Sequence, residues 1–264
     1  MLMAVQHSLM FFVPSDLPAQ SVSLWCTALL LNAVLIALAQ PLPLLTRSGW
    51  CHAGILGTVL WGALGWRGWL AVVAYLAMGS MVTKLGFARK QHLGLAEARG
   101  GRRGPENVWG SAFTGLVLAL LLAARVGPQQ LLLIGFAASF AAKLADTFGS
   151  EIGKRWGRTT LLITTLRPVP AGTEGAVSLE GTLASALGSL LMTVVMVALG
   201  LLHVGIAAGL VLAVGFIATL LESLLGAFGQ GRWPWLSNEL VNGLQTAWAA
   251  ALAMAAAWLL APAG

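Results

Sequence analysis

Long apolar runs, separated by short polar stretches, make up most of the chain. The runs that are long enough to be membrane segments occupy residues 21–39, 50–66, 69–83, 110–125, 129–145, 181–202, 204–228 and 243–261. A helix needs about 20 mainly apolar residues to cross a bilayer. Only Trp66-Arg67-Gly68 divides the short second and third runs, so a re-entrant pair is an alternative interpretation there. The pattern predicts an all-α bundle of about eight transmembrane helices, with seven as the alternative.

The composition excludes a water-soluble protein. Of the 264 residues, 58% are hydrophobic and only 9% are charged, and the mean hydropathy is +0.84. Soluble domains carry roughly 25% charged residues, which cover a surface that faces water. We therefore expect residues 1–264 to form a single integral membrane domain.

Basic residues lie mainly in two loops. Residues 84–109 hold six and residues 143–180 hold five of the 15 lysines and arginines. One helical hairpin separates these loops, so both face the same side. The positive-inside rule assigns that side, together with loop 229–242, to the cytoplasm. This sorting accounts for the net charge of +6 without a nucleic-acid partner.

The nine acidic residues are sorted in the same way. On this topology, every one except Asp16 lies in a cytoplasmic loop or at the cytoplasmic end of a helix. Carboxylates contribute little to the orientation of a membrane protein, so orientation does not explain this arrangement. Ionisable groups near membrane depth favour a functional interpretation. We therefore expect a polar site on the cytoplasmic face.

The segment 143–155 is the richest in polar side chains. If the helix continues past the membrane, one of its faces presents Lys143, Asp146, Thr147 and Ser150. With Glu151, these carboxylates and hydroxyls suit Mg²⁺, which binds through one or two carboxylates plus substrate phosphates. The alternative is a Lys–Asp helix pair beside a packing ridge of Gly149, Gly153 and Gly157.

Two other segments combine acids with hydroxyl or amide groups. Residues 172–182 include Glu174, Ser178 and Glu180 among several glycines. A helix N-cap at Ser178 explains that serine and Glu180, but not Glu174. In residues 237–242, Asn238 is a natural N-cap for the last helix and is followed one turn later by Asn242.

Arginine and glycine are interleaved in residues 98–110. Forked guanidinium donors and backbone N–H groups can bind phosphate oxygens, and an ordinary positive-inside loop is the alternative. Upstream, Lys84, Arg89 and Lys90 are interpreted as topology determinants or lipid-headgroup contacts. The sequence contains no P-loop and no G-x-G-x-x-G motif. Its cysteines and histidines show no metal-ligand spacing.

Together these segments resemble the DUF92, or transmembrane protein 19, family. The resemblance is carried by Thr83-Lys84-Leu-Gly86-Phe-Ala-Arg89-Lys90, Gly100 to Asn107, Ala145-Asp146-Thr147, Ser150-Glu151-Ile-Gly153, Gly172-Thr173-Glu174-Gly175, Ser178-Leu-Glu180-Gly181, Glu222-Ser223-Leu-Leu-Gly226, and Ser237-Asn238-Glu239 with Asn242. It covers roughly residues 21–260 and is closest to the cyanobacterial and plastid branch. Glu222 is a departure, since many relatives have aspartate there.

The resemblance implies a kinase that converts phytyl phosphate, or a related prenyl phosphate, to the diphosphate for tocopherol synthesis. Distant similarity to dolichol and phytol kinases implies CTP as the donor, with Mg²⁺. A CTP-dependent prenol kinase and a CDP-lipid cytidylyltransferase are alternative enzymes. A transporter of a phosphorylated lipid or anion is the alternative outside enzymes. The product separates the three enzymes: a diphosphate, a monophosphate or a CDP-lipid.

The roles implied for individual residues fall into three sets. The catalytic set is Asp146, Glu151, Lys154 and Arg155. The metal set is Asp146, Glu151 and Glu222. The substrate- and nucleotide-binding set is Lys84, Arg89, Lys90, Arg99, Arg102, Arg103, Glu106, Asn107, Thr147, Ser150, Thr173, Glu174, Ser178, Glu180, Ser223, Asn238 and Asn242.

The membrane in which the protein works is inferred from its first twenty residues. They contain no Lys or Arg, so neither a secretory signal nor an Arg-rich transit peptide is expected. This favours a bacterial plasma membrane or a cyanobacterial thylakoid, with the active site on the cytoplasmic side. Homo-oligomerisation is left open.

Overall fold

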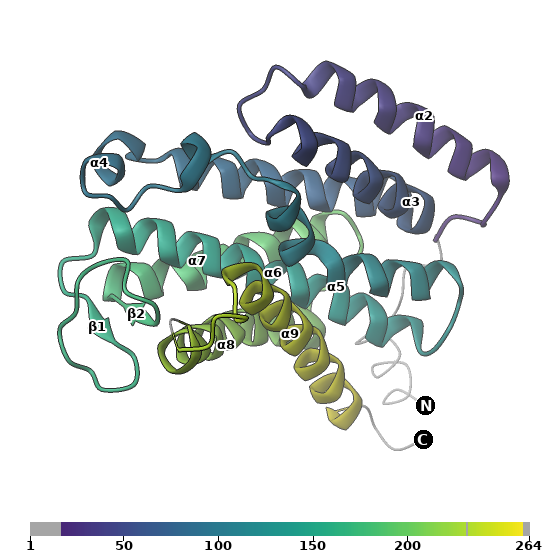
Figure 1. Ribbon diagram of the computed structural model, residues 1–264. Coiled ribbons are helices and arrows are strands. Elements are labelled where there is room, and N and C mark those ends of the chain that lie inside the picture. The colour runs from purple at the N-terminus through teal and green to yellow at the C-terminus, as the bar shows by residue number, and fades with distance from the viewer. Residues whose placement is uncertain (1–16, 231, 261–264) are drawn as a thin grey trace.

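The computed structural model describes residues 17–230 and 232–260. Its elements are α2 (Val22–Ala39), α3 (Arg47–Lys84), α4 (Phe87–His92), the 3₁₀ helix η1 (Ala98–Gly101), α5 (Pro105–Ala123), α6 (Gln129–Trp156), β1 (Leu161–Leu162), β2 (Ala176–Val177), α7 (Leu179–Ala198), α8 (Ile206–Gly229) and α9 (Asn238–Leu260). In this part of the chain, seven helices are long and apolar enough to cross a membrane. The predicted all-α transmembrane bundle is confirmed (Figure 1).

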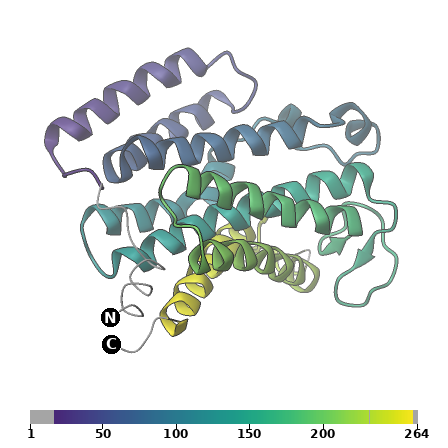
Figure 2. The same cartoon turned by 180° about the vertical axis from the view of Figure 1, so that it is seen from behind.

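Helix α3 consists of two antiparallel arms that meet at Gly65. This glycine has a non-helical backbone with a φ of 69°, and Figures 1 and 2 show the two arms side by side. Gly49 and Gly79 consequently both lie against Arg103, whereas in a straight helix they would be about 45 Å apart. The two arms correspond to the predicted runs 50–66 and 69–83. With each arm of α3 counted separately, the described residues form eight long apolar helical segments.

Helix α6 is the centre of the bundle. It packs against α3, α5, α7, α8 and α9, and 89% of its most apolar window is buried, compared with 11% for α2. Because protein surrounds α6, its polar side chains can be placed at membrane depth without facing lipid. The helix also continues to Trp156, past the predicted end of its apolar run at residue 145.

Small residues allow α6 and α7 to approach each other closely. A Cβ at Gly188 would lie 2.7 Å from the carbonyl oxygen of Leu144, and a Cβ at Gly149 would collide with the Ser185 side chain. Gly153 faces Ser178 and Gly181 of the α7 start. The predicted glycine ridge is therefore a helix-packing surface, on the same helix that carries the polar set.

Serines cap the starts of two helices near the polar end, α7 and α9. Ser178 Oγ accepts a hydrogen bond from the Gly181 N–H at 3.1 Å, as predicted for α7. At α9 the prediction was wrong by one residue, because Ser237 Oγ accepts from the Leu240 N–H at 3.3 Å. With Ser237 as the cap, the side chain of Asn238 lines the cavity described below.

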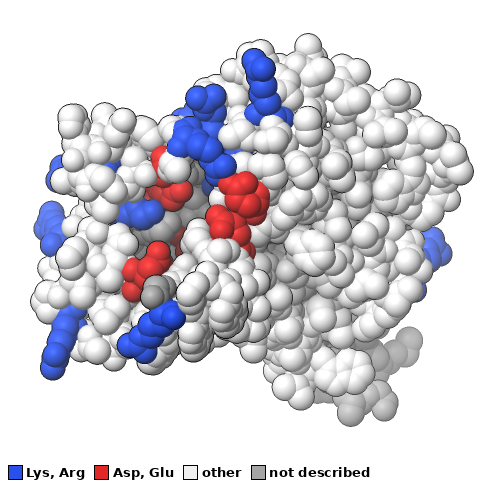
Figure 3. All heavy atoms as spheres, viewed as in Figure 1, with Lys and Arg blue, Asp and Glu red and all other residues white. Residues whose placement is uncertain are grey.

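Loops and charges gather at one end of the bundle. The ends of α3 and α6, the short α4 and the antiparallel β1–β2 pair lie there, away from the start of α2 and the end of α9 (Figures 1 and 2). Figure 3 shows acidic and basic side chains around a hollow at this end, while most of the remaining visible surface is uncharged. Residues of both predicted basic loops line one cavity at this end. Asp16 lies outside the described residues.

Candidate active site

A polar cavity of about 360 Å³ opens at the charged end of the bundle. Helices α3 and α5 to α9 line it, together with the η1 region and the residues before and after β2. Its carboxylates belong to Glu97, Asp146, Glu151, Glu174 and Glu222, and its cations to Arg99, Arg102, Arg103, Lys143 and Lys154. The cavity therefore places opposite charges together at the end of an otherwise apolar bundle.

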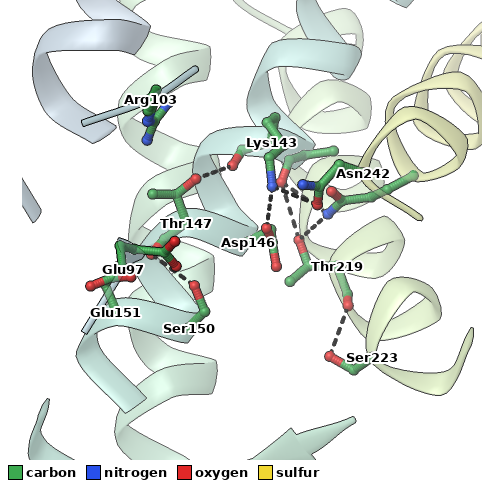
Figure 4. Close-up of polar contacts among 12 residues, drawn as sticks. Glu97, Arg103, Lys143, Asp146, Thr147, Ser150, Glu151, Thr219, Ser223 and Asn242 are labelled. Atoms are coloured by element: carbon green, nitrogen blue, oxygen red, sulfur yellow. Dashed lines mark hydrogen bonds and ion pairs between the residues drawn. The ribbon is translucent and has the colours of Figure 1, made fainter. Parts of the chain in front are cut away.

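Lys143 and Asp146 form an ion pair one turn apart on α6 (Figure 4). Lys143 Nζ also donates a hydrogen bond to Asn242 Oδ1 of α9 at 2.9 Å. The lysine side chain is 7% exposed and the aspartate side chain 16% exposed. Since the pair uses Asp146 Oδ2, the other carboxylate oxygen is available to a ligand in the cavity.

A buried hydrogen-bond network supports this pair from below. Gln245 Nε2 of α9 donates to the Ala142 carbonyl and to Thr219 Oγ1, both at 3.2 Å. Thr219 Oγ1 of α8 in turn donates to the Gly215 carbonyl at 3.1 Å. Gln245 is fully buried. These contacts tie α6, α8 and α9 together directly beneath Lys143, which fixes the floor of the cavity.

Glu151 lies five residues beyond Asp146, and its side chain is almost fully buried. Lys90, from α4, forms an ion pair with it, and their side chains are 0% and 2% exposed. Lys90 Nζ also donates to the Thr83 carbonyl at 2.7 Å. The structure thus places Lys90 inside the protein rather than among lipid headgroups. Lys154 lies 3.9 Å from Glu151 on the cavity side.

Two loop carboxylates at the cavity mouth have pKa values shifted in opposite directions. Burial raises the pKa of Glu97, but the charge and hydrogen bond of Lys154, 3.4 Å away, and the charges of Arg103 and Lys143 together outweigh burial, so the net pKa lies below the ordinary value. At Glu174, burial raises the pKa, Lys154 opposes the rise, and the negative charge of Asp146 adds to it. The pKa of Glu174 therefore lies above its ordinary value.

The arginines of the 98–110 segment occupy two different positions. Arg99 forms an ion pair with Glu106 and donates to Asn107 Oδ1 at 2.9 Å. Both side chains of the ion pair are more than 40% exposed. Arg103 turns inward instead, and its Nη1 donates to Tyr75 Oη at 2.9 Å. Arg99 belongs to the rim of the cavity and Arg103 to its interior.

The carboxylates fit Mg²⁺ only in a limited way. Among the residues that the structure describes, no group of three or more Asp, Glu, His or Cys is arranged to hold a metal ion. Asp146 and Glu222 both line the cavity. They satisfy the smaller requirement of one or two carboxylates plus substrate phosphates. Glu151, which the sequence also suggested for the metal, is engaged by Lys90.

Most of the predicted site residues line this one cavity. Those that do not are Lys84, Arg89, Lys90, Glu106, Arg155 and Glu180. Arg155 stacks over the Trp156 ring, 4.8 Å from its centroid. Glu180 lies 3.9 Å from Arg158.

Sequence reasoning missed several polar residues that line the cavity, among them Tyr75, Glu97, Ser111 and Thr219. Tyr75 is the only tyrosine of the chain, and its position within an apolar run is the one signal that could have drawn attention to it.

Comparison with known proteins places the chain in a family. The profile of "Integral membrane protein DUF92" matches residues 30–250. An uncharacterized membrane protein of Synechocystis sp. is 51% identical over 235 residues, which cover 87% of this chain and 90% of the relative. The protein VTE6, chloroplastic, of Arabidopsis thaliana is 44% identical over 225 residues, which cover 83% and 67%.

A third relative is more distant. An uncharacterized membrane protein of Methanocaldococcus jannaschii is 29% identical over 223 residues, which cover 83% of this chain and 88% of the relative. No solved structure matches the chain significantly. The matched residues 30–250 include every residue that lines the cavity. The chain therefore belongs to the DUF92 family of integral membrane proteins, with relatives in the cyanobacterial and plastid branch.

Proposed function

We propose that this protein is a phosphotransferase that converts a prenyl phosphate, such as phytyl phosphate, to the diphosphate at the expense of a nucleoside triphosphate. The observation that carries the proposal is the cavity, in which carboxylates, cations and hydroxyls converge at one end of an apolar bundle. The resemblance to the phytyl-phosphate kinase branch and the 44% identity to a chloroplastic plant protein support it.

The cavity suits the polar part of such a substrate. Few apolar side chains line it, among them Leu220 and Val177, so it matches phosphate and nucleotide better than a hydrocarbon chain. A prenyl chain would remain in the surrounding lipid, beside exposed leucines such as those of α7. We assign the open end of the cavity to the cytoplasm, because the basic loops lie there.

Phosphoryl transfer depends mainly on positioning and on neutralising charge. In this proposal Arg102, Arg103, Lys143 and Lys154 bind phosphate oxygens. Asp146 and Glu222 would hold Mg²⁺, which when bound supplies positive charge to the donor phosphates. The acceptor is a phosphate, which is ionised at neutral pH. It therefore needs no general base.

CTP is the proposed donor, from the similarity to dolichol and phytol kinases. The residues before β2 would approach it with backbone rather than side chains, since Gly172 and Gly175 have φ values of 85° and 74° at the cavity wall. Glycine permits this conformation and allows close approach of a ligand to the backbone.

The test uses purified, detergent-solubilised protein with phytyl phosphate and Mg²⁺. Parallel reactions receive CTP labelled at the γ- or the α-phosphate, and the lipid products are separated. Labelled phytyl diphosphate from γ-labelled CTP alone is the expected result. Labelled lipid from α-labelled CTP would instead identify a cytidylyltransferase.

Two further reactions complete the test. Phytol replaces phytyl phosphate in one, where a labelled monophosphate would identify a prenol kinase. Other nucleoside triphosphates replace CTP in the second, and a faster reaction with one of them would overturn the choice of donor. Failure to label lipid in any reaction would refute the enzyme and favour transport of a phosphorylated lipid. Arg125→Gln, at the opposite end of the bundle, serves as the control variant.

A further inference from the structure

Arg103 is held in place by the only tyrosine of the chain. Its Nη1 donates to Tyr75 Oη at 2.9 Å, and its Cζ lies 5.4 Å from the centroid of the tyrosine ring. Tyr75 is 4% exposed, and its ring packs against Phe140, 5.7 Å between centroids. The hydrogen bond and the cation–π contact act on the same guanidinium, so its orientation is fixed before any ligand binds.

The backbone of Arg103 is fixed as well. Its N–H donates to the Leu44 carbonyl at 3.1 Å, and its own carbonyl accepts from the Thr46 N–H at 3.0 Å. Glycines on both arms of α3 make room for it. A Cβ at Gly49 would lie 2.6 Å from the Arg103 carbonyl oxygen, and a Cβ at Gly79 would lie 2.6 Å from its Nη2. The α3 hairpin is therefore shaped around this one arginine.

Among the described residues, Arg103 also differs from most other cavity cations in forming no ion pair with a carboxylate, although its charge acts on Glu97 at longer range. Arg99 is paired with Glu106, Lys143 with Asp146, and Lys154 with Glu97. Arg102 lacks such a pair too, but it is exposed to solvent. A pre-oriented, partly buried guanidinium without a carboxylate is a receptor for an anion such as phosphate. Figure 4 shows its side chain pointing toward the polar groups of α6.

The depth of this position indicates which phosphate it receives. Tyr75 precedes the end of α3 by nine residues, which corresponds to about 13 Å along the helix. Ser111 of α5 lies beside it and is 6% exposed. Arg99 and Arg102 are exposed at the rim, and under the proposed function a nucleotide arriving from solvent would meet these two arginines first. In-line transfer puts donor and acceptor on opposite sides of the transferred group.

We propose that Arg103, positioned by Tyr75, forms the subsite for the phosphate of the lipid acceptor at the inner end of the cavity. This assignment rests on the proposed kinase function and specifies which of its two substrates the arginine binds. Tyr75 is a positioning residue in this scheme, because it acts on the acceptor through Arg103.

The test measures binding and kinetics separately on the full-length, detergent-solubilised protein. Phytyl phosphate alone is titrated by calorimetry into the wild type, Arg103→Lys, Tyr75→Phe and the control Arg125→Lys. Lysine cannot reproduce the fork of an arginine, so Arg103→Lys should weaken binding about tenfold or more. Tyr75→Phe keeps the ring but loses one hydrogen bond to a charged group, and should weaken binding roughly 3- to 10-fold. Arg125→Lys should bind as the wild type does.

Steady-state kinetics identify the substrate concerned. The KM for phytyl phosphate should rise in both variants, while the KM for CTP changes less than about twofold, since uniform binding of only one substrate is lost. Unchanged binding of phytyl phosphate by Arg103→Lys, or a rise in the KM for CTP alone, would overturn the assignment. Arginine-dependent binding without transfer from any nucleotide would refute the kinase and retain the lipid-phosphate site. The two failures are thus distinguishable.

Discussion

Two lysine–carboxylate pairs, each with its carboxylate on α6, have the same chemistry and different surroundings. Lys143–Asp146 joins residues one turn apart on the same helix and is open to the cavity, with Asp146 16% exposed. Lys90–Glu151 joins α4 to α6 and is almost fully enclosed, with exposures of 0% and 2%. The two carboxylates are only five positions apart in the sequence.

The difference between the pairs indicates a functional role for Lys143–Asp146 and a structural role for Lys90–Glu151. A pair within one helix does not hold the fold together, because both partners are already fixed by that helix. Its cavity-facing oxygen can therefore serve a ligand. A pair between two elements connects them, and the buried carboxylate of Glu151 is already engaged by Lys90 of α4. We infer that Asp146 serves the reaction and that Glu151 holds α4 against the bundle.

The largest expected effect follows from removing the charge of Asp146. Asp146→Asn should reduce kcat/KM for phytyl phosphate by at least about 100-fold, the scale of losing one preorganised electrostatic group. Membrane insertion and the elution of the protein on size exclusion should be unchanged, because the amide oxygen of the substituted side chain can still accept a hydrogen bond from Lys143. Glu239→Gln, at the start of α9 and outside the cavity lining, is the matched control. Full activity in Asp146→Asn would sink the assignment of this pair to catalysis.

Breaking the enclosed Lys90–Glu151 pair should change the stability of the protein rather than its activity. Lys90→Met leaves the Glu151 carboxylate buried without its partner, and should lower the free energy of unfolding by about 3–5 kcal/mol. The double variant Lys90→Met/Glu151→Gln removes the stranded charge and should recover most of that loss. Activity per folded molecule should remain within about threefold of the wild type. Denaturant unfolding in detergent, monitored by tryptophan fluorescence, measures the change.

Two results would contradict the different roles assigned to the two pairs. If Lys90→Met unfolded like the wild type but lost transfer activity, Glu151 would belong to the reaction, as the sequence first suggested. If the double variant were no more stable than Lys90→Met, the stranded charge would not be the cause of the loss.

The sequence predicted the elements of this site better than their roles. The apolar runs located the helices, and the sorting of charge located the end at which the cavity lies, because both are properties of the local sequence. Asp146 and Glu151 could not be told apart, because the distinction depends on Lys90, 61 residues before Glu151. Tyr75 escaped notice for the same reason, since its partner Arg103 lies across the fold.

The smallest effects concern the loop carboxylates beside the two pairs. The raised pKa of Glu174 means that the folded protein favours its protonated form. Glu174 therefore lowers stability as the pH rises from the ordinary carboxyl pKa, about 4.3, through the raised value. Glu174→Gln should accordingly raise the melting temperature at neutral pH and have no effect well below pH ~4.

Glu97 should behave in the opposite way, because burial is outweighed by Lys154 together with Arg103 and Lys143, which hold its pKa below the ordinary value. It contributes stability above pH ~4.3, which is lost as the pH falls through its lowered pKa. Glu97→Gln should therefore lower the melting temperature at neutral pH. Since the side chain is 51% exposed, solvent screens the pair and the change should stay below about 1 kcal/mol. Melting curves at a series of pH values would show two variants diverging from the wild type in opposite directions. If both variants shifted the melting temperature in the same direction, Glu97 and Glu174 would share one electrostatic environment. That result would contradict the opposite pKa shifts of the two carboxylates.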